Sequence, residues 1–293
     1  MKSEVQDLID KINKQRPKMS KGQRAISDYI IANYDKAAFM TAAKLGKTVG
    51  VSESTVSRYA MQLGYDGYPE LQKAFQRLIK NKLTTIQRME LSSEQSNADI
   101  LKNVLKTDIN NIRTTLDNID DDAFERIVEK ICSAENVYLL GQRSAATTIQ
   151  FMGYYLNFLM PNVHVITSGV SDIVEQLSHI GKGDVLVTLS FPRYARRVVD
   201  GAEYAKKRGA EVAVITDSEY SPLVPYADHV LYARSDMTSF VDSLVAPMSL
   251  VNAILIAVSV AKKQETMDNL ANLETIWRDY GVYKSKDDKL FEE

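Results

Sequence analysis

The chain of 293 residues is poor in the residue types that build disulfides, metal sites and membrane spans. It has one cysteine, Cys132, and three histidines. A lone cysteine excludes a disulfide within the chain and fits a reducing compartment. The longest apolar stretch, LVNAILIAVSVA at 250–261, is shorter than the roughly 20 residues that span a bilayer. The first residues, MKSEVQDLID, lack the apolar segment of a secretory signal. These absences predict a cytoplasmic protein without a membrane segment.

The net charge of −2 conceals two unequal parts of the chain. Residues 1–90 hold 16 Lys and Arg against 9 Asp and Glu, whereas the remainder holds 20 against 29. A basic segment joined to an acidic one predicts that the first part meets a polyanion. Charge alone leaves chance and ordinary solvated helix faces as the alternative.

The basic part shows helical periodicity and no convincing strand. We expect helices near 3–13, 20–34, 41–48 and 53–63. Between the last two, Gly50 permits a tight turn and Ser52 is a good N-cap. Two short helices around a glycine turn are typical of the helix-turn-helix, whose second helix enters the major groove of DNA. The alternative is a helical hairpin that binds nothing.

The exposed side of the second of these helices carries the candidate DNA contacts. Short hydroxyl side chains permit close approach to the DNA backbone, and Arg58 can bond a guanine edge or pair with a phosphate. The expected partner is a double-stranded operator, bound as two half-sites by a homodimer or homotetramer. The predicted DNA-binding residues are Ser52, Ser54, Thr55, Ser57, Arg58 and Gln62.

The stretch GVSESTVSRYAMQLGYDGYPELQ at 50–72 resembles the N-terminal domain of RpiR-type bacterial transcription regulators. The family pattern is VS-x-x-TV-x-R-[FY], then LG[FY], then G[FY]-x-x-L[QK], and the resemblance covers about residues 1–80. Gly46 departs from it, because an alanine is usual there. A glycine keeps the small size that a helix crossing needs but weakens the helix by up to about 1 kcal/mol.

From residue 122 onward, helices alternate with short apolar strands. Strands buried on both faces and separated by helices predict a parallel sheet covered on both sides. The expected fold class is α + α/β: an all-helical helix-turn-helix domain followed by a three-layer α/β/α domain with a mainly parallel five-stranded sheet. The predicted strands are 136–140, 163–166, 184–190, 211–216 and 229–233.

The organisation predicted from these patterns has four parts. They are a DNA-binding domain at 1–82, a helical connector at 83–120, an α/β effector domain at 121–265 and a helical tail at 266–293. Two of the predicted helices are notable for their apolar residues. The connector helix near 98–119 has a stripe that is either docked in a core or used for dimerisation, and the helix at 239–262 is apolar almost all round, as suits a buried or interface helix.

Two loops that follow strands hold the candidate ligand-binding residues, since parallel sheets bind ligands at the carboxyl ends of their strands. In LLGQRS, Gly141 leads to Ser144 at a helix start, where backbone N–H groups can meet an anion. In SFPRYARR, Ser190 ends a strand and a helix is expected to begin near Arg193. Arginines in a first turn oppose the helix dipole, and a bound anion would offset that cost. The alternatives are an N-cap serine and arginines that face water.

The pair of loops resembles the sugar isomerase (SIS) domain, which completes the RpiR-type architecture. There, G-x-x-S and S-x-S-G-x-[ST] loops surround a sugar phosphate. This chain keeps the first motif, but Pro192 and Ala195 stand at two hydroxyl positions of the second. Arginines can replace those hydroxyls by charge, which leaves a phosphosugar, a carboxylated sugar or another small anion open as effector. The implied effector residues are Gly141, Arg143, Ser144, Ser190, Arg193, Tyr194 and Arg196.

The resemblance implies a transcriptional regulator whose operator binding is controlled by a small anionic, sugar-like metabolite. The alternative is an aldose–ketose isomerase with an accessory helical domain, which needs a general base beside the sugar. No base and acid assemble around Ser190, because the histidines and the candidates Glu175 and Glu203 fall on strands, helices or helix ends. No metal-ligand spacing, P-loop or catalytic triad is present. We therefore expect no enzyme activity, cofactor or metal.

Overall fold

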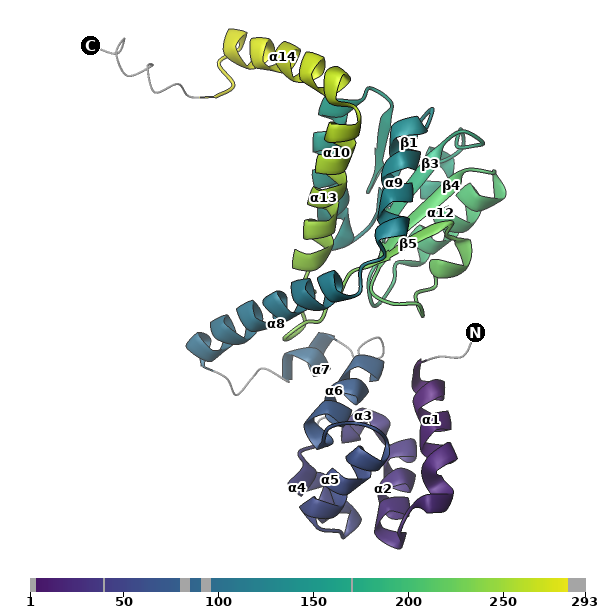
Figure 1. The fold of residues 1–293 in the computed structure, drawn as a ribbon, viewed down its shortest axis with the longest axis vertical. Coiled ribbons are helices and arrows are strands. Elements are labelled where there is room, and N and C mark those ends of the chain that lie inside the picture. The colour runs from purple at the N-terminus through teal and green to yellow at the C-terminus, as the bar shows by residue number, and fades with distance from the viewer. Residues whose placement is uncertain (1–3, 39, 80–84, 91–95, 170, 284–293) are drawn as a thin grey trace, which may run out of the picture. The chain divides into compact units, whose positions relative to one another are not determined.

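The computed structural model describes residues 4–38, 40–79, 85–90, 96–169 and 171–283. The chain divides into two compact units (Figure 1). The first joins residues 1–105 with 236–241, and the second joins 106–235 with 242–293. The four-part organisation expected from the sequence stays a prediction.

Helices are the regular secondary structure of the first unit, and its described residues contain no strand. The helices are α1 (Glu4–Gln15), a 3₁₀ turn (Arg16–Lys18), α2 (Lys21–Ala32), α3 (Tyr34–Ala37), α4 (Ala42–Val49), α5 (Glu53–Gln62), α6 (Tyr68–Ile79) and α7 (Thr85–Glu90). Ser52 caps α5 as the sequence predicts and accepts a hydrogen bond from the backbone N–H of Thr55, and Ser20 and Gln23 form a capping box at the start of α2.

The turn between α4 and α5 depends on two glycines. Gly50 ends α4 with a φ of 78°, a conformation in which a glycine avoids the clash of a Cβ. Gly46 lies where α4 meets the chain that enters α5, and a Cβ there would stand 2.7 Å from the carbonyl oxygen of Val51. The glycine is therefore a packing requirement in this chain.

The second unit alternates helices with parallel strands. Its first helix, α8, begins in residues assigned to the first unit. The elements are α8 (Asn97–Asp117), α9 (Asp121–Ser133), β1 (Val137–Gly141), α10 (Ala145–Leu159), β2 (Val163–Ile166), α11 (Ile173–Gln176), β3 (Val185–Leu189), α12 (Arg196–Lys207), β4 (Glu211–Thr216), a 3₁₀ turn (Val224–Tyr226), β5 (His229–Tyr232), α13 (Val245–Ala261) and α14 (Lys263–Asp279).

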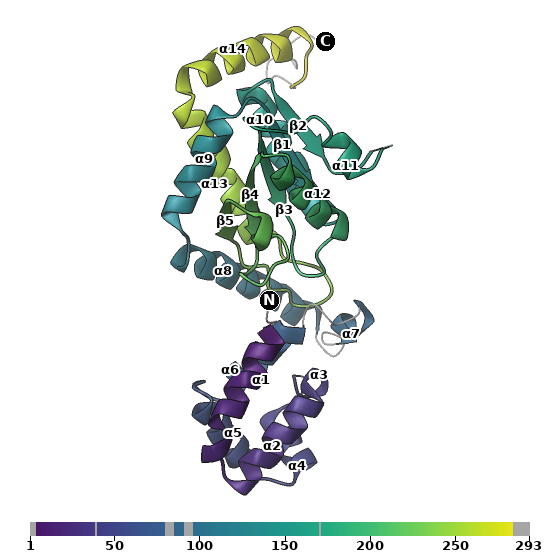
Figure 2. The same ribbon diagram turned by 90° about the vertical axis from the view of Figure 1, so that its right-hand side faces the viewer.

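The five strands form one parallel sheet in the order β2-β1-β3-β4-β5, which confirms the predicted fold class. Helices α9, α10 and α13 pack on one face, and α11 and α12 pack on the other (Figures 1 and 2). After β1 the chain adds β2 on one side of β1, and then crosses over to add β3 on the opposite side of β1. The carboxyl ends of β1 and β3 thus flank the topological switch point, where open α/β sheets bind ligands.

Two helices of the second unit begin later than the sequence predicts. Helix α12 begins at Arg196, so the expected start near Arg193, with Pro192 in the first turn, is wrong. Arg193 has a φ of 69°, which lies outside the right-handed helical region. Helix α13 begins at Val245, and residues 239–244 form no helix.

The apolar stripe of α8 does not enter the core of the second unit. Leu105, Ile109 and Leu116 are exposed by 54%, 58% and 70%, whereas the polar Asn111 and Thr115 are buried. Thr115 accepts a hydrogen bond at 2.9 Å from the backbone N–H of Arg234, which follows β5. The core-docked alternative for this helix is therefore wrong.

No single described helix is both long and apolar enough to cross a bilayer. Helices α13 and α14 meet the length and composition limits only as a pair, and that pair is bent by 102°.

Candidate functional site

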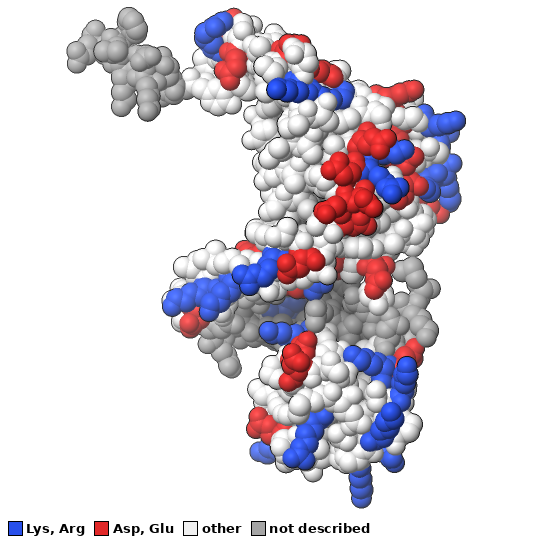
Figure 3. Space-filling model, viewed as in Figure 1, with Lys and Arg blue, Asp and Glu red and all other residues white. Residues whose placement is uncertain are grey.

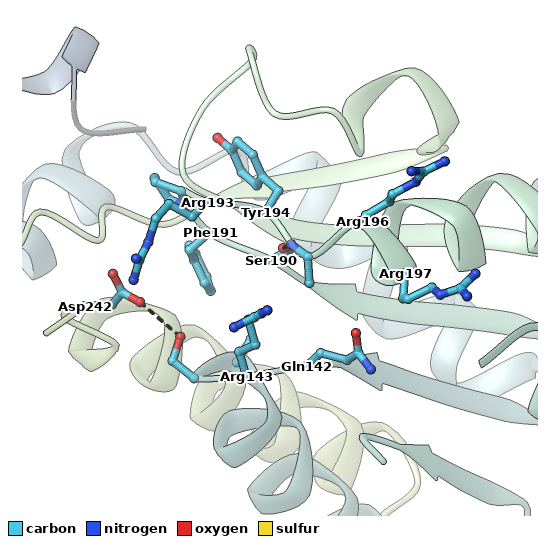
Figure 4. Close-up of a pocket in the computed structure, with 13 residues that line it drawn as sticks. Gln142, Arg143, Ser190, Phe191, Arg193, Tyr194, Arg196, Arg197 and Asp242 are labelled. Atoms are coloured by element: carbon cyan, nitrogen blue, oxygen red, sulfur yellow. Dashed lines mark hydrogen bonds between the residues drawn. The ribbon is translucent and has the colours of Figure 1, made fainter. Parts of the chain in front are cut away.

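A cavity of about 550 Å³ opens in the second unit between the loops that follow β1 and β3. Its walls come from three segments of the chain: the β1–α10 loop, the β3–α12 loop and the approach to α13 (Figure 4). The residues that line it are Gln142, Arg143, Ser144, Ala145, Ser190, Phe191, Pro192, Arg193, Tyr194, Ala195, Arg196, Arg197 and Asp242.

Each of the two loops turns on an arginine in the left-handed backbone region. Arg143 has a φ of 57° and Arg193 a φ of 69°, and no other described residue except glycine has a positive φ. Such a conformation costs of order 1–3 kcal/mol and persists only where the surroundings enforce it, most often at functional sites. Figure 4 shows Arg143 pointing into the space between the loops and Arg193 extending toward Asp242.

Ser144 stands at the N-cap of α10 but does not cap it. It has helical backbone angles, and its side chain makes no cap hydrogen bond. Its hydroxyl donates instead to a carboxylate oxygen of Asp242 at 3.1 Å (Figure 4). The predicted N-cap alternative for this serine is therefore wrong, and its hydroxyl belongs to the cavity.

Ser190 and Tyr194 hold the shape of the second loop. Ser190 is buried, and its hydroxyl accepts from the backbone N–H of Ala195 at 3.4 Å, so it substitutes for a cap on α12. Its carbonyl accepts from the hydroxyl of Thr216 at 2.7 Å. Tyr194 donates its phenolic proton to Asp217 at 2.7 Å. These bonds tie the loop to the end of β4 and leave the arginines to face the cavity.

Two further arginines belong to the first turn of α12. Arg197 pairs with Asp172 at 3.1 Å, and Arg196 approaches Asp200 at 3.9 Å. The side chain of Arg196 is 92% exposed, so this ion pair is strongly solvated and adds little stability. The lining thus contains four guanidinium groups against one carboxylate, that of Asp242. Planar guanidinium groups bind carboxylate or phosphate through paired hydrogen bonds, so the cavity favours an anion.

Six of the seven effector residues expected from the sequence line this one cavity, and Gly141 does not. Gly141 ends β1, where a Cβ would stand 2.6 Å from the side chain of Ile149, so a glycine is required there by packing. Sequence reasoning missed Asp242, which it placed inside a helix. A lone carboxylate in an otherwise apolar segment was the available signal. The other lining residues outside the expected set are Gln142, Ala145, Phe191, Pro192, Ala195 and Arg197.

The residues considered as catalytic bases lie elsewhere. His164 stacks on Tyr138 in the edge of the sheet, and His229 approaches Glu211 at 3.6 Å. Glu175 completes the capping box of α11, and Glu203 forms an ion pair with Lys207 at 2.5 Å. The lining of the cavity contains no His or Glu.

The predicted DNA-binding residues lie on the solvent side of α5 and its cap. Ser52, Ser54 and Arg58 are exposed, and Thr55, Ser57 and Gln62 are partly exposed. Within the described residues, the guanidinium of Arg58 has no hydrogen-bond or ion-pair partner. Val56, Tyr59 and Ala60 on the other side of α5 are buried. The helix therefore presents a polar face from a fixed position.

Basic side chains flank this helix on two neighbouring elements. Lys44 and Lys47 are exposed on α4, and Lys21 and Arg24 are exposed at the start of α2. The start of α2 lies close to α5, since a Cβ on Gly22 would stand 3.5 Å from the Thr55 side chain. Figure 3 shows Lys and Arg side chains on the visible face of the first unit. Sequence reasoning missed these four residues because it considered only the second helix of the motif.

Comparison with known proteins agrees with the two motifs. The rpiR-family helix-turn-helix domain matches residues 6–82, and the SIS domain matches residues 130–257. An uncharacterised HTH-type transcriptional regulator of Clostridium perfringens is 24% identical over 237 residues, which cover 80% of this chain and 84% of that protein.

Solved structures resemble the chain as well. The sugar isomerase domain of an RpiR transcription factor from Sphaerobacter thermophilus is 30% identical, with a TM-score of 0.58, over 60% of this chain and 98% of that one. The Vibrio vulnificus NanR protein, solved in complex with ManNAc-6P, is 21% identical, with a TM-score of 0.56, over 93% of this chain and 98% of that one. The sequence motifs and these matches lead to one conclusion: the chain belongs to the RpiR family of helix-turn-helix transcriptional regulators that carry a SIS domain.

Proposed function

We propose that the cavity between the β1–α10 and β3–α12 loops binds a small anionic sugar derivative, and that this ligand controls operator binding by α5. The observation that carries the proposal is that four arginines belong to the lining of one cavity at the switch point of the sheet, and that two of them, Arg143 and Arg193, stand in left-handed loops. The cavity of about 550 Å³ has the size of a small-molecule site, which typically spans 300–1,000 Å³.

The anionic group of the ligand is a phosphate or a carboxylate. A guanidinium binds either one through two parallel hydrogen bonds, so the arginines fit both. The related NanR protein was solved with ManNAc-6P, which supports a phosphosugar. Because Pro192 and Ala195 remove two hydroxyl donors, the arginines carry a larger share of the binding here than in SIS loops that keep those hydroxyls. We propose Arg193 and Arg196 as their replacements.

The site acts as a sensor and not as an isomerase. Isomerisation of a sugar needs a base and an acid beside two adjacent carbons, and the single carboxylate of the lining, Asp242, already accepts a hydrogen bond from Ser144. A cytoplasmic regulator that binds an operator and a metabolite, without metal or cofactor, is the function we assign.

The regulator acts as a homodimer formed by a second copy of this chain on the α10–α13 face. Figure 3 shows that the surface over α10 and α13 is almost free of charge. Tyr154, Ile256 and Val260 on these helices are exposed by 54%, 65% and 67%. An exposed apolar face of this kind marks an interaction surface. A twofold dimer lets two copies of α5 meet the two half-sites of a palindromic operator.

The proposal is tested by a thermal-shift screen of phosphorylated sugars, sugar acids and inorganic phosphate, followed by operator titration with each hit. The operator is first selected from a random duplex pool. A true effector adds about 2.7 kcal/mol to the free energy of unfolding at 100 times its Kd, and so raises the melting temperature. It also changes the midpoint of the operator titration. A ligand that stabilises the protein without changing DNA binding, or turnover of a sugar phosphate detected by NMR, contradicts the proposal.

A further inference from the structure

The segment 236–242, which leads into α13, connects the cavity to the first unit by covalent continuity. Residues 236–241 belong to the first unit, whereas Asp242 belongs to the second and lines the cavity. The next residue, Ser243, donates a hydrogen bond to Asp108 of α8 at 2.6 Å. The backbone of Asp242 is thus held on its C-terminal side by this bond and continues on its N-terminal side into residues of the first unit.

Within the first unit the segment is held by α7. The guanidinium of Arg88 lies 3.1 Å from the sulfur of Met237, and the hydroxyl of Ser239 donates to the carbonyl oxygen of Arg88 at 3.5 Å. The side chain of Arg88 is almost fully buried. These contacts give the segment a defined attachment three residues before Asp242.

Within the second unit Asp242 has the position of an anionic ligand. Its carboxylate accepts from Ser144, the serine of the first effector loop, at 3.1 Å, and Arg193 of the second loop extends toward it (Figure 4). It is the one carboxylate among the four arginines of the described lining. A phosphate or carboxylate that enters this cavity competes with Asp242 for the same donors and is repelled by its charge.

We infer that Asp242 is an internal substitute for the anionic group of the effector, and that an entering anion expels it and thereby moves the 236–242 segment. This inference rests on the proposed function of the cavity and names its regulation. In this inference the 236–242 segment has two arrangements, one with Asp242 in the cavity and one with Asp242 expelled. Coupling between a ligand site and a DNA site requires such a two-state element, whose equilibrium both sites shift. The same competition lowers the affinity of the free protein for anions.

The first test measures the affinity for inorganic phosphate by isothermal titration calorimetry on the full chain. Asp242→Asn keeps an oxygen that accepts from Ser144 but removes the charge, so it should bind phosphate at least about five-fold more tightly, the lower end of typical coupling factors. Asp200→Asn is the matched control, because Asp200 pairs with Arg196 and Arg197 of the same lining without belonging to the segment. An equal gain in both variants would be a general effect of charge and would overturn the inference.

The second test follows hydrogen exchange of the amides of 236–244. Saturating phosphate should speed their exchange in the wild-type chain, and Asp242→Asn should exchange at that faster rate without phosphate. Asp200→Asn should behave as the wild type in both conditions. Unchanged exchange in the wild type with phosphate bound would overturn the inference and leave the anion site intact. Absence of saturable phosphate binding in every variant, together with no stabilisation by any sugar phosphate or sugar acid of the thermal-shift screen, would instead remove the site itself, and with it both proposals.

Discussion

At the scale of single residues, the backbone angles of Arg143 and Arg193 are the most informative feature of the molecule. Left-handed positions are usually given to glycine, or to asparagine and aspartate, because a Cβ there costs energy. An arginine at each of two facing loops implies that the side chains are needed where they are. Backbone strain at these two arginines is then a mark of the proposed ligand site, since strain of this kind persists most often at functional sites.

Replacing Arg143 separates strain from charge. Arg143→Gly relieves the strain of a left-handed backbone angle at a residue with a Cβ. The free energy of unfolding should therefore stay equal or rise by up to about 1 kcal/mol, and the melting temperature should follow it. It also removes a charged donor, which should weaken phosphate binding at least about ten-fold. Arg143→Ala is the control, since it loses the same charge but keeps the strain and should melt below the glycine variant. Phosphate binding by Arg143→Gly at wild-type affinity would exclude Arg143 from the site.

Replacing Arg58 tests the reading of DNA sequence by α5. Its guanidinium is exposed and has no partner among the described residues, so it can bond a base edge. Arg58→Ala should therefore weaken binding of the selected operator by about 1–3 kcal/mol and relax specificity at one position. Lys47→Ala on α4 should instead weaken all sequences alike and reduce the salt slope by about 1. Fluorescence anisotropy titrations at several salt concentrations distinguish the two. Loss of equal size on operator and random DNA in Arg58→Ala would reassign Arg58 to the phosphates.

At the scale of elements, the sequence predicts most of the fold because its apolar periods are strong. Every strand was expected within one residue of its ends, and α4 and α5 were expected around the Gly50 turn. The start of α12 was predicted too early because no residue pattern in SFPRYARR indicates that Arg193 takes a positive φ. For α8 the sequence left core docking and dimerisation open, because an apolar stripe predicts burial without saying against what; core docking is wrong, since this helix packs through Thr115 and Asn111. Asp242 was missed because its role depends on a loop that only the fold brings to the cavity.

A buried tyrosine on α5 makes the stability of the first unit fall at alkaline pH. Burial raises the pKa of Tyr59 to about 12, against an ordinary value of 10. The folded chain then keeps its proton where the unfolded chain loses it. The contribution of this tyrosine to stability is therefore fully present below pH 10 and falls as pH rises from 10 to 12, by up to about 1.4 kcal/mol per pH unit.

Calorimetric unfolding at pH 9, 10 and 11 measures this dependence. The melting temperature of Tyr59→Phe should fall less between pH 10 and 11 than that of the wild type. A residual slope remains in this variant, because burial also raises the pKa of Tyr68 to about 12. Tyr280→Phe, at a residue that is 82% exposed, should retain the full wild-type slope. Equal slopes in all three proteins would contradict the assignment.

At the scale of the whole molecule, the dimer proposed on the uncharged face over α10 and α13 can be tested by placing charges on that face. Ile256→Asp combined with Val260→Asp places two charges where a second copy is proposed to pack, so light scattering should detect one chain in place of two. Operator affinity should fall with the loss of the second half-site, while phosphate affinity should be retained. Leu116→Asp, on the exposed stripe of α8, is the comparison and should stay dimeric. Dissociation by Leu116→Asp alone would move the interface to α8.

The division of the chain also has a consequence for how such regulators can exchange parts. The first unit is discontinuous: most of it precedes α8, and six residues of it, 236–241, return after β5. A recombination event near residue 105 would join the helix-turn-helix part of one protein to the second unit of another. The second protein would then also supply residues 236–241, which belong to the first unit. In such a hybrid the two pieces of the first unit would come from different proteins, so an exchange of the whole first unit requires three crossovers, near residues 105, 235 and 241.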